Sequence, residues 1–225
     1  MDVIAFLQAT PLAKNLSEAQ LEVLARSTSE KHYRAGQLII GEGHRVSAVY
    51  IVAQGTVKMS KNAHNGKEQT LYLLRPKELF GMCAAFSDCI FPANAMTLEK
   101  STLLSVPGTV LEDLSKKDPT ILRNILFILS NRLKESMSLI ESLSLMETPK
   151  RVASFLLFSN LKQTCSTGAV AKLEISQREL SKMLGTTPET ISRVLKKLEG
   201  EKIIQVEGKN IRILNCEALE ELATG

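Results

Sequence analysis

The sequence predicts an α+β fold in three consecutive parts: an N-terminal domain of short strands over residues 1–117, a long helix over residues 118–147, and a small helical domain with a β-hairpin over residues 148–225. Three observations predict this division. Short apolar runs alternate with glycines and other turn residues through the first half of the chain. A helical pattern then begins at Asp118-Pro119, an N-cap followed by a proline at the first helical position. Towards the C-terminus, two short amphipathic segments flank a glycine, which is the pattern of a helix-turn-helix.

The composition limits the class of protein. The 225 residues carry a formal net charge of +4, which permits a nucleic-acid partner but does not by itself indicate one. No apolar run approaches the ~18 residues of a membrane helix, and the N-terminal segment lacks the basic region of a signal peptide, so we expect a cytoplasmic protein with no membrane partner. The spacing of the four cysteines does not indicate a disulfide framework. No nucleophile elbow, phosphate loop or His-x-x-x-His pair occurs, so an enzyme is not expected.

The first domain is expected to begin with helices and to continue as a barrel or sandwich. Residues 1 to about 30 have a helical pattern, with Ser17 as the N-cap of the stretch that begins at Glu18. From Lys31 onward, short β-prone runs are evenly spaced, and Asn65-Gly66 is a strong hairpin turn. Evenly spaced short strands with turn residues between them favour a barrel or sandwich over an α/β sheet.

The long helix carries a seam of residues that step by four and three alternately. The members of this seam are apolar except for one serine: Leu122, Leu126, Leu129, Leu133, Ser136, Ile140 and Leu143. Such a pattern is typical of a two-stranded parallel coiled coil. A helix of roughly 28 residues is about 42 Å long, which is more than a domain of this size covers. We therefore expect a homodimer, with Ile125, Ile128 and Met137 facing the strand domain; the alternative is a seam that packs only on its own domain.

The stretch from Ser176 to Leu198 indicates a helix-turn-helix. Ser176 and Glu179 have the spacing of a capping box at the start of the first helix. Gly185 permits a tight turn, and Thr187-Pro188 supplies the cap and the first residue of the second helix. Two β-prone runs joined by a short turn follow and predict a wing, so we expect a winged helix-turn-helix.

The second helix separates an apolar stripe, which repeats at i, i+3, i+4 and i+7 from Ile191, from a polar face. A solvated helix can carry such a face without function, but this one lies at the N-terminal end, where a recognition helix reaches base edges. Glu189 can accept from cytosine N4, Ser192 offers a hydroxyl, and Arg193 can donate to guanine O6 and N7. Two lysines further along are placed to meet phosphates. The predicted residues for binding double-stranded DNA are Thr187, Pro188, Glu189, Ser192, Arg193, Lys196 and Lys197.

These features together resemble, end to end, the CRP/FNR superfamily of bacterial transcription regulators. Gly36–Ile39 and Val49–Gly55 are similar to the first strands of the β-roll in that family, and Pro188–Arg193 is similar to the core of its recognition helix. The resemblance implies a cyclic-nucleotide-binding-like jelly roll as sensor domain, a dimerisation helix, and RNA polymerase as a partner. The order Glu-x-x-Ser-Arg resembles the FNR branch, which implies a palindromic site of the form TTGA-N6-TCAA.

The resemblance also locates an effector pocket and argues against two effectors. The candidate pocket residues are Phe80, Gly81, Met82, Cys83 and Leu126. The cyclic-AMP branch has Phe-Gly-Glu and Arg-Ser where this chain has Phe80-Gly81-Met82 and Ala93-Asn94. A buried phosphate without its cation is strongly unfavourable, so cyclic AMP is not expected. An iron–sulfur cluster held by N-terminal cysteines is not expected either, because no cysteine precedes Cys83.

What remains resembles the branches that sense nitric oxide or carbon monoxide through haem. The candidate haem ligands are Cys83, Met82, His32, His44 and His64, and no other metal is expected. Alternatives stay open: Cys83 can be a core residue or form a redox pair with Cys89, and the histidines can be surface residues. The sensor domain can also be degenerate, which would leave a regulator that binds DNA independently of any effector.

Overall fold

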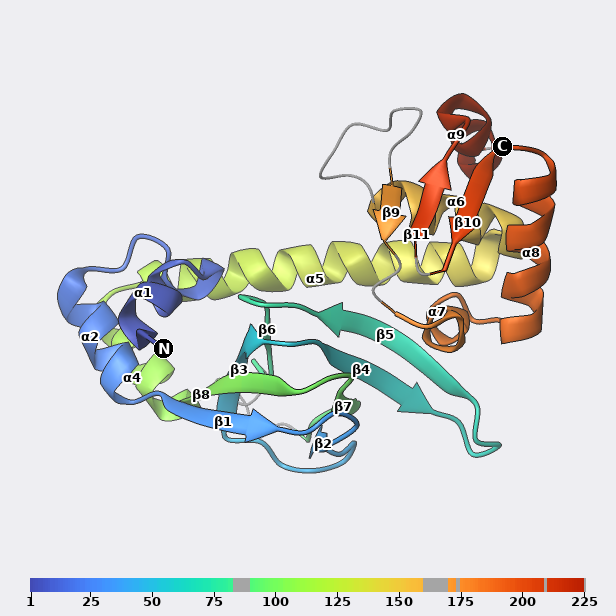
Figure 1. Ribbon diagram of the computed structural model, residues 1–225. Helices are drawn as coiled ribbons and strands as arrows, with labels where there is room; N and C mark the ends of the chain where they lie inside the picture. The colour runs from blue at the N-terminus through green and yellow to red at the C-terminus, as the bar shows by residue number, and fades with distance from the viewer. Residues whose placement is uncertain (83–89, 160–169, 173–174, 209, 225) are drawn as a thin grey trace. The chain divides into compact units, whose positions relative to one another are not determined.

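The computed structural model describes residues 1–82, 90–159, 170–172, 175–208 and 210–224. The chain divides into two units, residues 1–136 and 137–225, and the division falls within the long helix α5 (Thr120–Leu145). The predicted α+β fold is confirmed: a sheet domain comes first, a long helix follows, and a helix-turn-helix with a β-hairpin lies at the C-terminal end (Figure 1).

The N-terminal unit is built on two antiparallel four-stranded sheets (Figure 1). One sheet has the strand order β1-β8-β3-β6, and the other has the order β2-β7-β4-β5. The strands are β1 (Ser29–Tyr33), β2 (Leu38–Ile40), β3 (Ala48–Gln54), β4 (Val57–Asn62), β5 (Glu68–Leu74), β6 (Leu79–Phe80), β7 (Asn94–Thr97) and β8 (Ser101–Pro107). The predicted hairpin turn at Asn65-Gly66 joins β4 to β5, with Gly66 at a φ of +81°.

Apolar side chains fill two cores, one on each face of the β1-β8-β3-β6 sheet. Alternation along β8 sends Leu103 to one core and Leu104 and Val106 to the other. The core between the two sheets contains Ile40, Val52, Val57, Leu74, Phe80, Phe91, Ala95 and Leu103. The second core, called the helix-side core below, lies between the sheet and the helices. The helices contribute Leu7, Leu12, Leu21, Leu24, Leu111, Leu114, Ile121, Ile125 and Ile128 to it.

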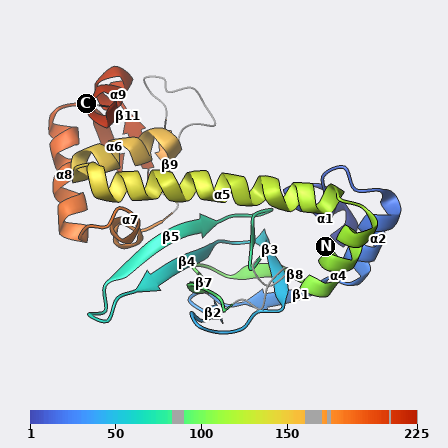
Figure 2. The same ribbon diagram turned by 180° about the vertical axis from the view of Figure 1, so that it is seen from behind.

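Short helices cover the second core together with the start of α5. They are α1 (Val3–Gln8), the 3-10 turn η1 (Pro11–Ala13), α2 (Glu18–Arg26) and α4 (Gly108–Lys117). Figure 2, the view from behind, shows them grouped at the same end of the sheets as the start of α5. The predicted N-cap Ser17 is confirmed: its Oγ accepts from the amide of Gln20 at 3.3 Å, and the Gln20 side chain returns a bond to the Ser17 amide at 2.8 Å. Helix α4 was not predicted.

The start of α5 is tied to the N-terminal helices by polar contacts. Asp118 caps the helix, because its Oδ1 accepts from the amide of Thr120 at 2.8 Å, while its Oδ2 accepts from Gln20 at 3.1 Å. The amide and the hydroxyl of Thr120, followed by Gln20, hold the pKa of Asp118 below its ordinary value. One turn later, the Asn124 side chain donates to the carbonyls of Leu12 and Lys14 at 2.8 and 2.7 Å.

Helix α5 buries one apolar face and exposes the other. Ile125 and Ile128 are buried in the helix-side core, as predicted. Met137 is 63% exposed, so the prediction that it faces the sheet domain was wrong; the N-terminal unit ends one residue before it, at Ser136. Four seam residues are between 44% and 64% exposed: Leu126, Leu129, Leu133 and Ile140.

The C-terminal unit combines four helices with a three-stranded antiparallel sheet of order β10-β11-β9 among its described residues. Its elements are α6 (Thr148–Ser159), β9 (Val170–Lys172), α7 (Gln177–Met183), α8 (Pro188–Gly200), β10 (Ile204–Glu207), β11 (Asn210–Ile213) and α9 (Cys216–Thr224). The predicted break at Thr148-Pro149 is confirmed, because α5 ends at Leu145 and α6 begins at Thr148. Strand β9 and helix α9 were not predicted.

One cysteine departs from the sequence-based expectation. Cys216, the first residue of α9, is disulfide-bonded, and the other three cysteines lie outside the described residues. Spacing along the chain does not reveal which thiols approach one another in space, and the prediction rested on spacing alone. Across the described ranges, no helix is both long enough and apolar enough to cross a membrane.

Candidate nucleic-acid interface

Helix α8 begins at the residues that the sequence marks as its start. Thr187 has an extended backbone, with φ −102° and ψ 155°, and its Oγ1 accepts from the amide of Thr190 at 3.3 Å. Pro188 occupies the first helical position, where a missing N–H leaves no hydrogen bond unmade. The predicted cap is therefore confirmed, and it fixes where the first turn of α8 lies.

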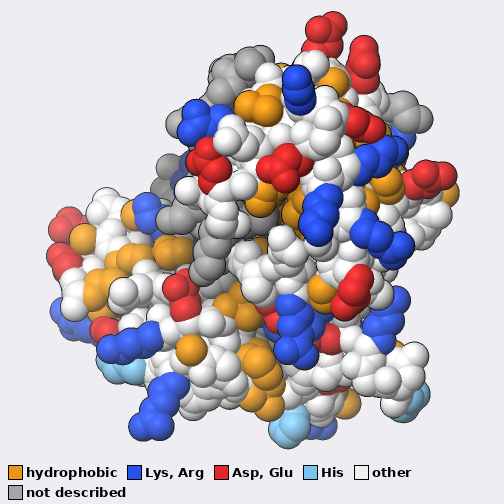
Figure 3. All heavy atoms as spheres, turned by 45° about the vertical axis from the view of Figure 1, so that its right-hand side comes forward, with side chains coloured by type: hydrophobic (Ala, Val, Ile, Leu, Met, Phe, Trp, Pro, Cys, Tyr) orange, Lys and Arg blue, Asp and Glu red, His pale blue; other side chains and the backbone are white. Residues whose placement is uncertain are grey.

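Helix α8 separates a buried stripe from an exposed polar face. The four apolar residues of the stripe are at most 9% exposed: Ile191, Val194, Leu195 and Leu198. On the other side Glu189, Arg193, Lys196 and Lys197 are exposed, and Ser192 is half-buried. Figure 3, in which the α8 side of the C-terminal unit comes forward, shows Lys and Arg side chains on this surface with Asp and Glu among them. The packed stripe holds the helix, and the polar groups remain accessible to a ligand.

The first turn of α8 presents an ionised acceptor next to a cationic donor. The backbone amide of Glu189 itself, the hydroxyl of Thr187 and then the charge of Arg193 lower the pKa of the Glu189 carboxyl, so this group accepts hydrogen bonds at neutral pH. The Nη2 of Arg193 donates to Thr190 Oγ1 at 3.3 Å. Sequence reasoning did not include Thr190, although its position three residues before Arg193 on a helix is a signal that could have found it.

The two lysines lie further along the helix than the acidic and cationic pair. The Nζ of Lys197 is 3.8 Å from Glu201 Oε1, and the Lys197 side chain is 71% exposed. An exposed ion pair of this length is weak, so it does not prevent the ammonium from meeting a phosphate.

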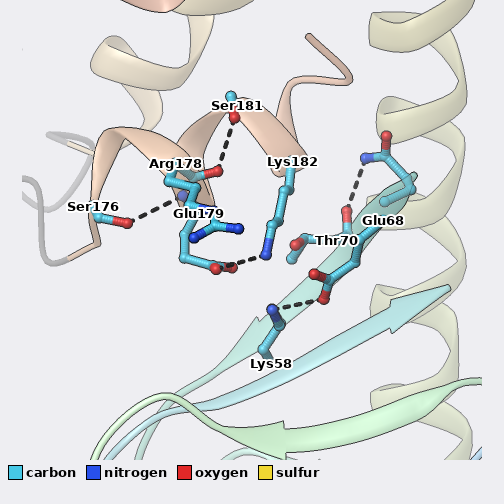
Figure 4. A network of polar contacts seen from close by, with 9 residues as sticks. Lys58, Glu68, Thr70, Ser176, Arg178, Glu179, Ser181 and Lys182 are labelled. Atoms are coloured by element: carbon cyan, nitrogen blue, oxygen red, sulfur yellow. Dashed lines mark hydrogen bonds and ion pairs between the residues drawn. The ribbon is translucent and has the colours of Figure 1, made fainter. Parts of the chain in front are cut away.

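Helix α7 lies before the turn and supports α8. Ser176 is its N-cap, with Oγ accepting from the amide of Glu179 at 3.2 Å, and the Glu179 carboxylate lies 2.9 Å from Lys182 Nζ (Figure 4). Leu180 is fully buried in the C-terminal unit, and Leu184 is 7% exposed. Gly185 then takes a φ of +61°, a left-handed conformation that turns the chain towards α8.

The predicted wing is present, with strands at Ile204–Glu207 and Asn210–Ile213 where the sequence predicts residues 203–206 and 211–214. Strands β10 and β11 pair with Ile204 opposite Ile213 and Glu207 opposite Asn210. Ile204, Ile211 and Ile213 are buried, so one face of the hairpin packs on the unit while the alternate residues point outward.

The structure separates the residues that were predicted to line an effector pocket. Phe80 is 3% exposed in the core between the sheets and stacks on Tyr50, with ring centroids 5.2 Å apart. Met82 belongs to the helix-side core. Gly81 lies between them at a φ of +81°, and a Cβ there would come within 2.9 Å of the Ala48 carbonyl. Leu126 is on the exposed face of α5, and Cys83 lies outside the described residues.

The three histidines are all exposed and lie on different segments. His32 on β1 contacts Thr102 Oγ1 at 3.1 Å and lies 3.6 Å from Glu30. His44 contacts its neighbouring Gly41 carbonyl at 3.2 Å, and His64 lies in the β4–β5 turn. Within the part of the chain that the structure describes, no group of three or more His, Cys, Asp or Glu side chains could hold a metal ion.

Comparison with known proteins places both units among regulators. Residues 30–118 match the cyclic nucleotide-binding domain family, and residues 150–222 match the Crp-like helix-turn-helix domain family. The chain is 31% identical to the fumarate and nitrate reduction regulatory protein of Vibrio cholerae, over 92% of this chain and 84% of that protein. It is 29% identical to the cyclic AMP receptor protein of Thermus thermophilus, over 97% of this chain and 99% of that protein. A CooA mutant from Carboxydothermus hydrogenoformans has the same fold, with a TM-score of 0.80, 20% identity, and coverage of 100% and 96% of the two chains.

Replacing Gly185 by alanine is expected to lower the free energy of unfolding of the C-terminal unit by about 1–2 kcal/mol, because a Cβ is strained at positive φ. Urea denaturation of the full chain measures the change. Gly200→Ala is the matched control: Gly200 lies in α8, and an added Cβ meets nothing within 4 Å. The control should be neutral or stabilise by about 0.5–1 kcal/mol. Equal losses in both variants would refute the role of the turn.

Proposed function

Because this chain belongs to the CRP/FNR superfamily of DNA-binding transcription regulators, we propose that it is a homodimeric, sequence-specific regulator controlled by a small effector other than cyclic AMP. The observation that carries the proposal is the exposed face of α8. Glu189 and Arg193 project from its first turns, while the opposite stripe is buried in the unit. A recognition helix needs this combination, because base edges are read by side chains whose backbone is held rigidly.

In this proposal α8 enters the major groove and reads a palindrome of the form TTGA-N6-TCAA. Arg193 donates to guanine O6 and N7, Glu189 accepts from cytosine N4, and Ser192 adds a hydroxyl contact. Thr187 and Pro188 bring the start of α8 close to the sugar-phosphate backbone of the DNA, and Lys196 and Lys197 contact its phosphates. Two half-sites about one helical turn apart, ~34 Å, match a two-fold dimer.

The proposed dimer forms along α5. Four large apolar side chains of the seam are exposed on the single chain, and a second copy would cover them in a parallel coiled coil. The proposed domains are a sensor over residues 1–117, a dimerisation helix over 118–147 and a DNA-binding domain over 148–225. The Thr148-Pro149 break between α5 and α6 is the proposed hinge. RNA polymerase as a partner and a cytoplasmic location are further parts of the proposal, and likeness to the family supports them.

The proposed effector is not cyclic AMP, although the relative from Thermus thermophilus is named a cyclic AMP receptor protein. The proposal rests on Phe80-Gly81-Met82 and Ala93-Asn94, which lack the glutamate and the arginine that the cyclic-AMP branch has at these positions. Haem with nitric oxide or carbon monoxide is the first effector to test; when bound, it would supply an iron that takes up the gas. His32, His44 and His64 do not fit a haem pocket, because all three are exposed.

Of the remaining candidate ligands, Met82 is buried at 7% exposure, and Cys83 lies outside the described residues. The alternative function is a regulator that binds DNA without any effector.

A labelled TTGA-N6-TCAA duplex is expected to bind the protein under anaerobic conditions, as measured by fluorescence anisotropy with and without haem and nitric oxide. Tight binding only with both additions, together with a Soret band, supports haem control. Tight binding without either supports the effector-independent alternative. A preference for a duplex that lacks TTGA-like half-sites contradicts the proposed reading by α8.

Arg193→Ala is expected to weaken binding to the palindrome by about 1–3 kcal/mol and to relax discrimination at the contacted guanine. Lys196→Ala should instead weaken all sequences alike and reduce the salt dependence of binding, since it removes a phosphate contact. Titrations at several salt concentrations separate the two effects. Lys100→Ala, an exposed change in the other unit, is the control. Full discrimination in Arg193→Ala would remove that residue from the reading of bases.

Leu133→Glu is expected to convert the dimer to a monomer, because it places a charge at the centre of the seam, where the leucine is 63% exposed on the single chain. Light scattering coupled to size exclusion measures the mass. Lys134→Glu, one residue away and outside the seam, is the matched control and should remain dimeric. A monomeric wild-type protein would rule out the coiled coil.

A further inference from the structure

We propose that four side chains of the N-terminal unit, Tyr72, Glu78, Arg132 and Ser136, form a latch that holds α5 on the sheet domain without any effector and so favours the DNA-binding dimer. The latch joins β5 and the β5–β6 turn to α5. The inference rests on the proposed function, because the state that it favours is the one that binds DNA.

The hydroxyl groups of the latch form a chain with a defined direction. Tyr72 Oη and Ser136 Oγ are hydrogen-bonded to one another, and Ser136 Oγ donates to the Arg132 carbonyl at 2.8 Å. A serine hydroxyl has a single proton, so Tyr72 must be the donor to Ser136. The bond between the two side chains is partly buried and connects residues 64 positions apart in the sequence.

The charged part of the latch surrounds the same tyrosine. The Arg132 guanidinium lies over the Tyr72 ring, 5.0 Å from its centroid. Its Nη1 is 2.7 Å from Glu135 on the same helix, and its Nη2 is 3.6 Å from Glu78 in the β5–β6 turn. The Arg132 side chain is only 19% exposed, so both carboxylates help to offset the loss of its hydration.

Glu78 places the latch next to the predicted effector segment. Its Oε2 accepts from the Arg75 amide at 2.6 Å, which fixes the turn before β6. The chain then passes directly through Phe80 to Met82. A displacement of this segment therefore reaches Arg132 through a few covalent bonds and one ion pair.

Ser136 connects the latch to the dimer seam. It is the one polar member of the seam pattern, and its hydroxyl is used by Tyr72 and the Arg132 carbonyl. Arg132 and Ser136 are four residues apart on one helix face, and the seam residue Leu133 lies between them in sequence. The latch thus orders the part of α5 that carries the exposed leucines. A helix ordered before association loses less entropy when it dimerises, so the latch should raise the affinity of the protein without effector for itself and for DNA.

The test compares wild type, Tyr72→Phe, Ser136→Ala and the double variant, without added effector, by anisotropy on the TTGA-N6-TCAA duplex. Tyr72→Phe removes only the hydroxyl and leaves the ring under Arg132. We expect about a threefold to tenfold loss of DNA affinity for Tyr72→Phe, the size of one hydrogen bond. The double variant should lose no more DNA affinity than one single variant does, because both changes break the same contact. Tyr33→Phe on β1, away from α5, is the matched control and should bind as wild type does.

Hydrogen exchange of the full chain without DNA gives a second readout. Tyr72→Phe should speed exchange of the amides in residues 126–136 several-fold, and Tyr33→Phe should not. If wild type binds the duplex only with haem and nitric oxide, the proposed function stands and the latch does not favour the DNA-binding state. If it binds under neither condition, the proposed function fails, and hydrogen exchange alone still decides whether the latch holds α5. Unchanged exchange in this segment overturns the latch. The latch is also overturned if the loss of DNA affinity in the double variant equals the sum of the losses in the two single variants.

Discussion

Helix α5 has two apolar faces, and its own chain can cover only one of them. Ile121, Ile125 and Ile128 pack into the core under the β1-β8-β3-β6 sheet, whereas the leucines of the seam point outward. Burial of the first face ties the helix to the domain that is proposed to sense. Exposure of the second face leaves a surface whose most favourable environment is another apolar surface. The arrangement of sheets, short helices and caps at the N-terminal end serves to hold α5 in this position, and the proposed regulator depends on it.

Local signals made the C-terminal unit largely predictable from the sequence. The caps at Ser176 and Thr187, the turn at Gly185 and the buried stripe from Ile191 all lie within one stretch of about 23 residues, and each involves contacts between near neighbours. The sheet domain could be predicted as a class, because short runs between turn residues indicate strands, but not as a strand order. Helices α4 and α9 and strand β9 were missed because short segments carry too little periodicity to identify.

Contacts between distant residues account for most of what the sequence could not show. Phe80 and Met82 are two residues apart and were predicted to share a pocket, yet strand alternation and the turn at Gly81 send them to different cores. Ser136 was read only as an interruption of the seam. Its partner Tyr72 lies on β5, and no spacing rule connects a strand residue to a helix residue so far along the chain. In contrast, the proposed DNA contacts of α8 rest on side chains that need no tertiary partner, so residue type and helical position were enough to propose them.

Helix α5 is held by polar contacts at three points, and its C-terminal end extends beyond them. Asp118 and Asn124 anchor its beginning, and Ser136, the last residue of the N-terminal unit, is held by Tyr72. Nine residues, 137–145, extend past that point. This overhang is about 14 Å long. Because Asp118 and Asn124 fix the beginning of α5, the helix turns about that end, and a sideways movement grows in proportion to the distance from it. The distance from Asn124 to Leu145 is almost twice the distance from Asn124 to Ser136, so a shift of the contact between Tyr72 and Ser136 is nearly doubled at the last residue of α5.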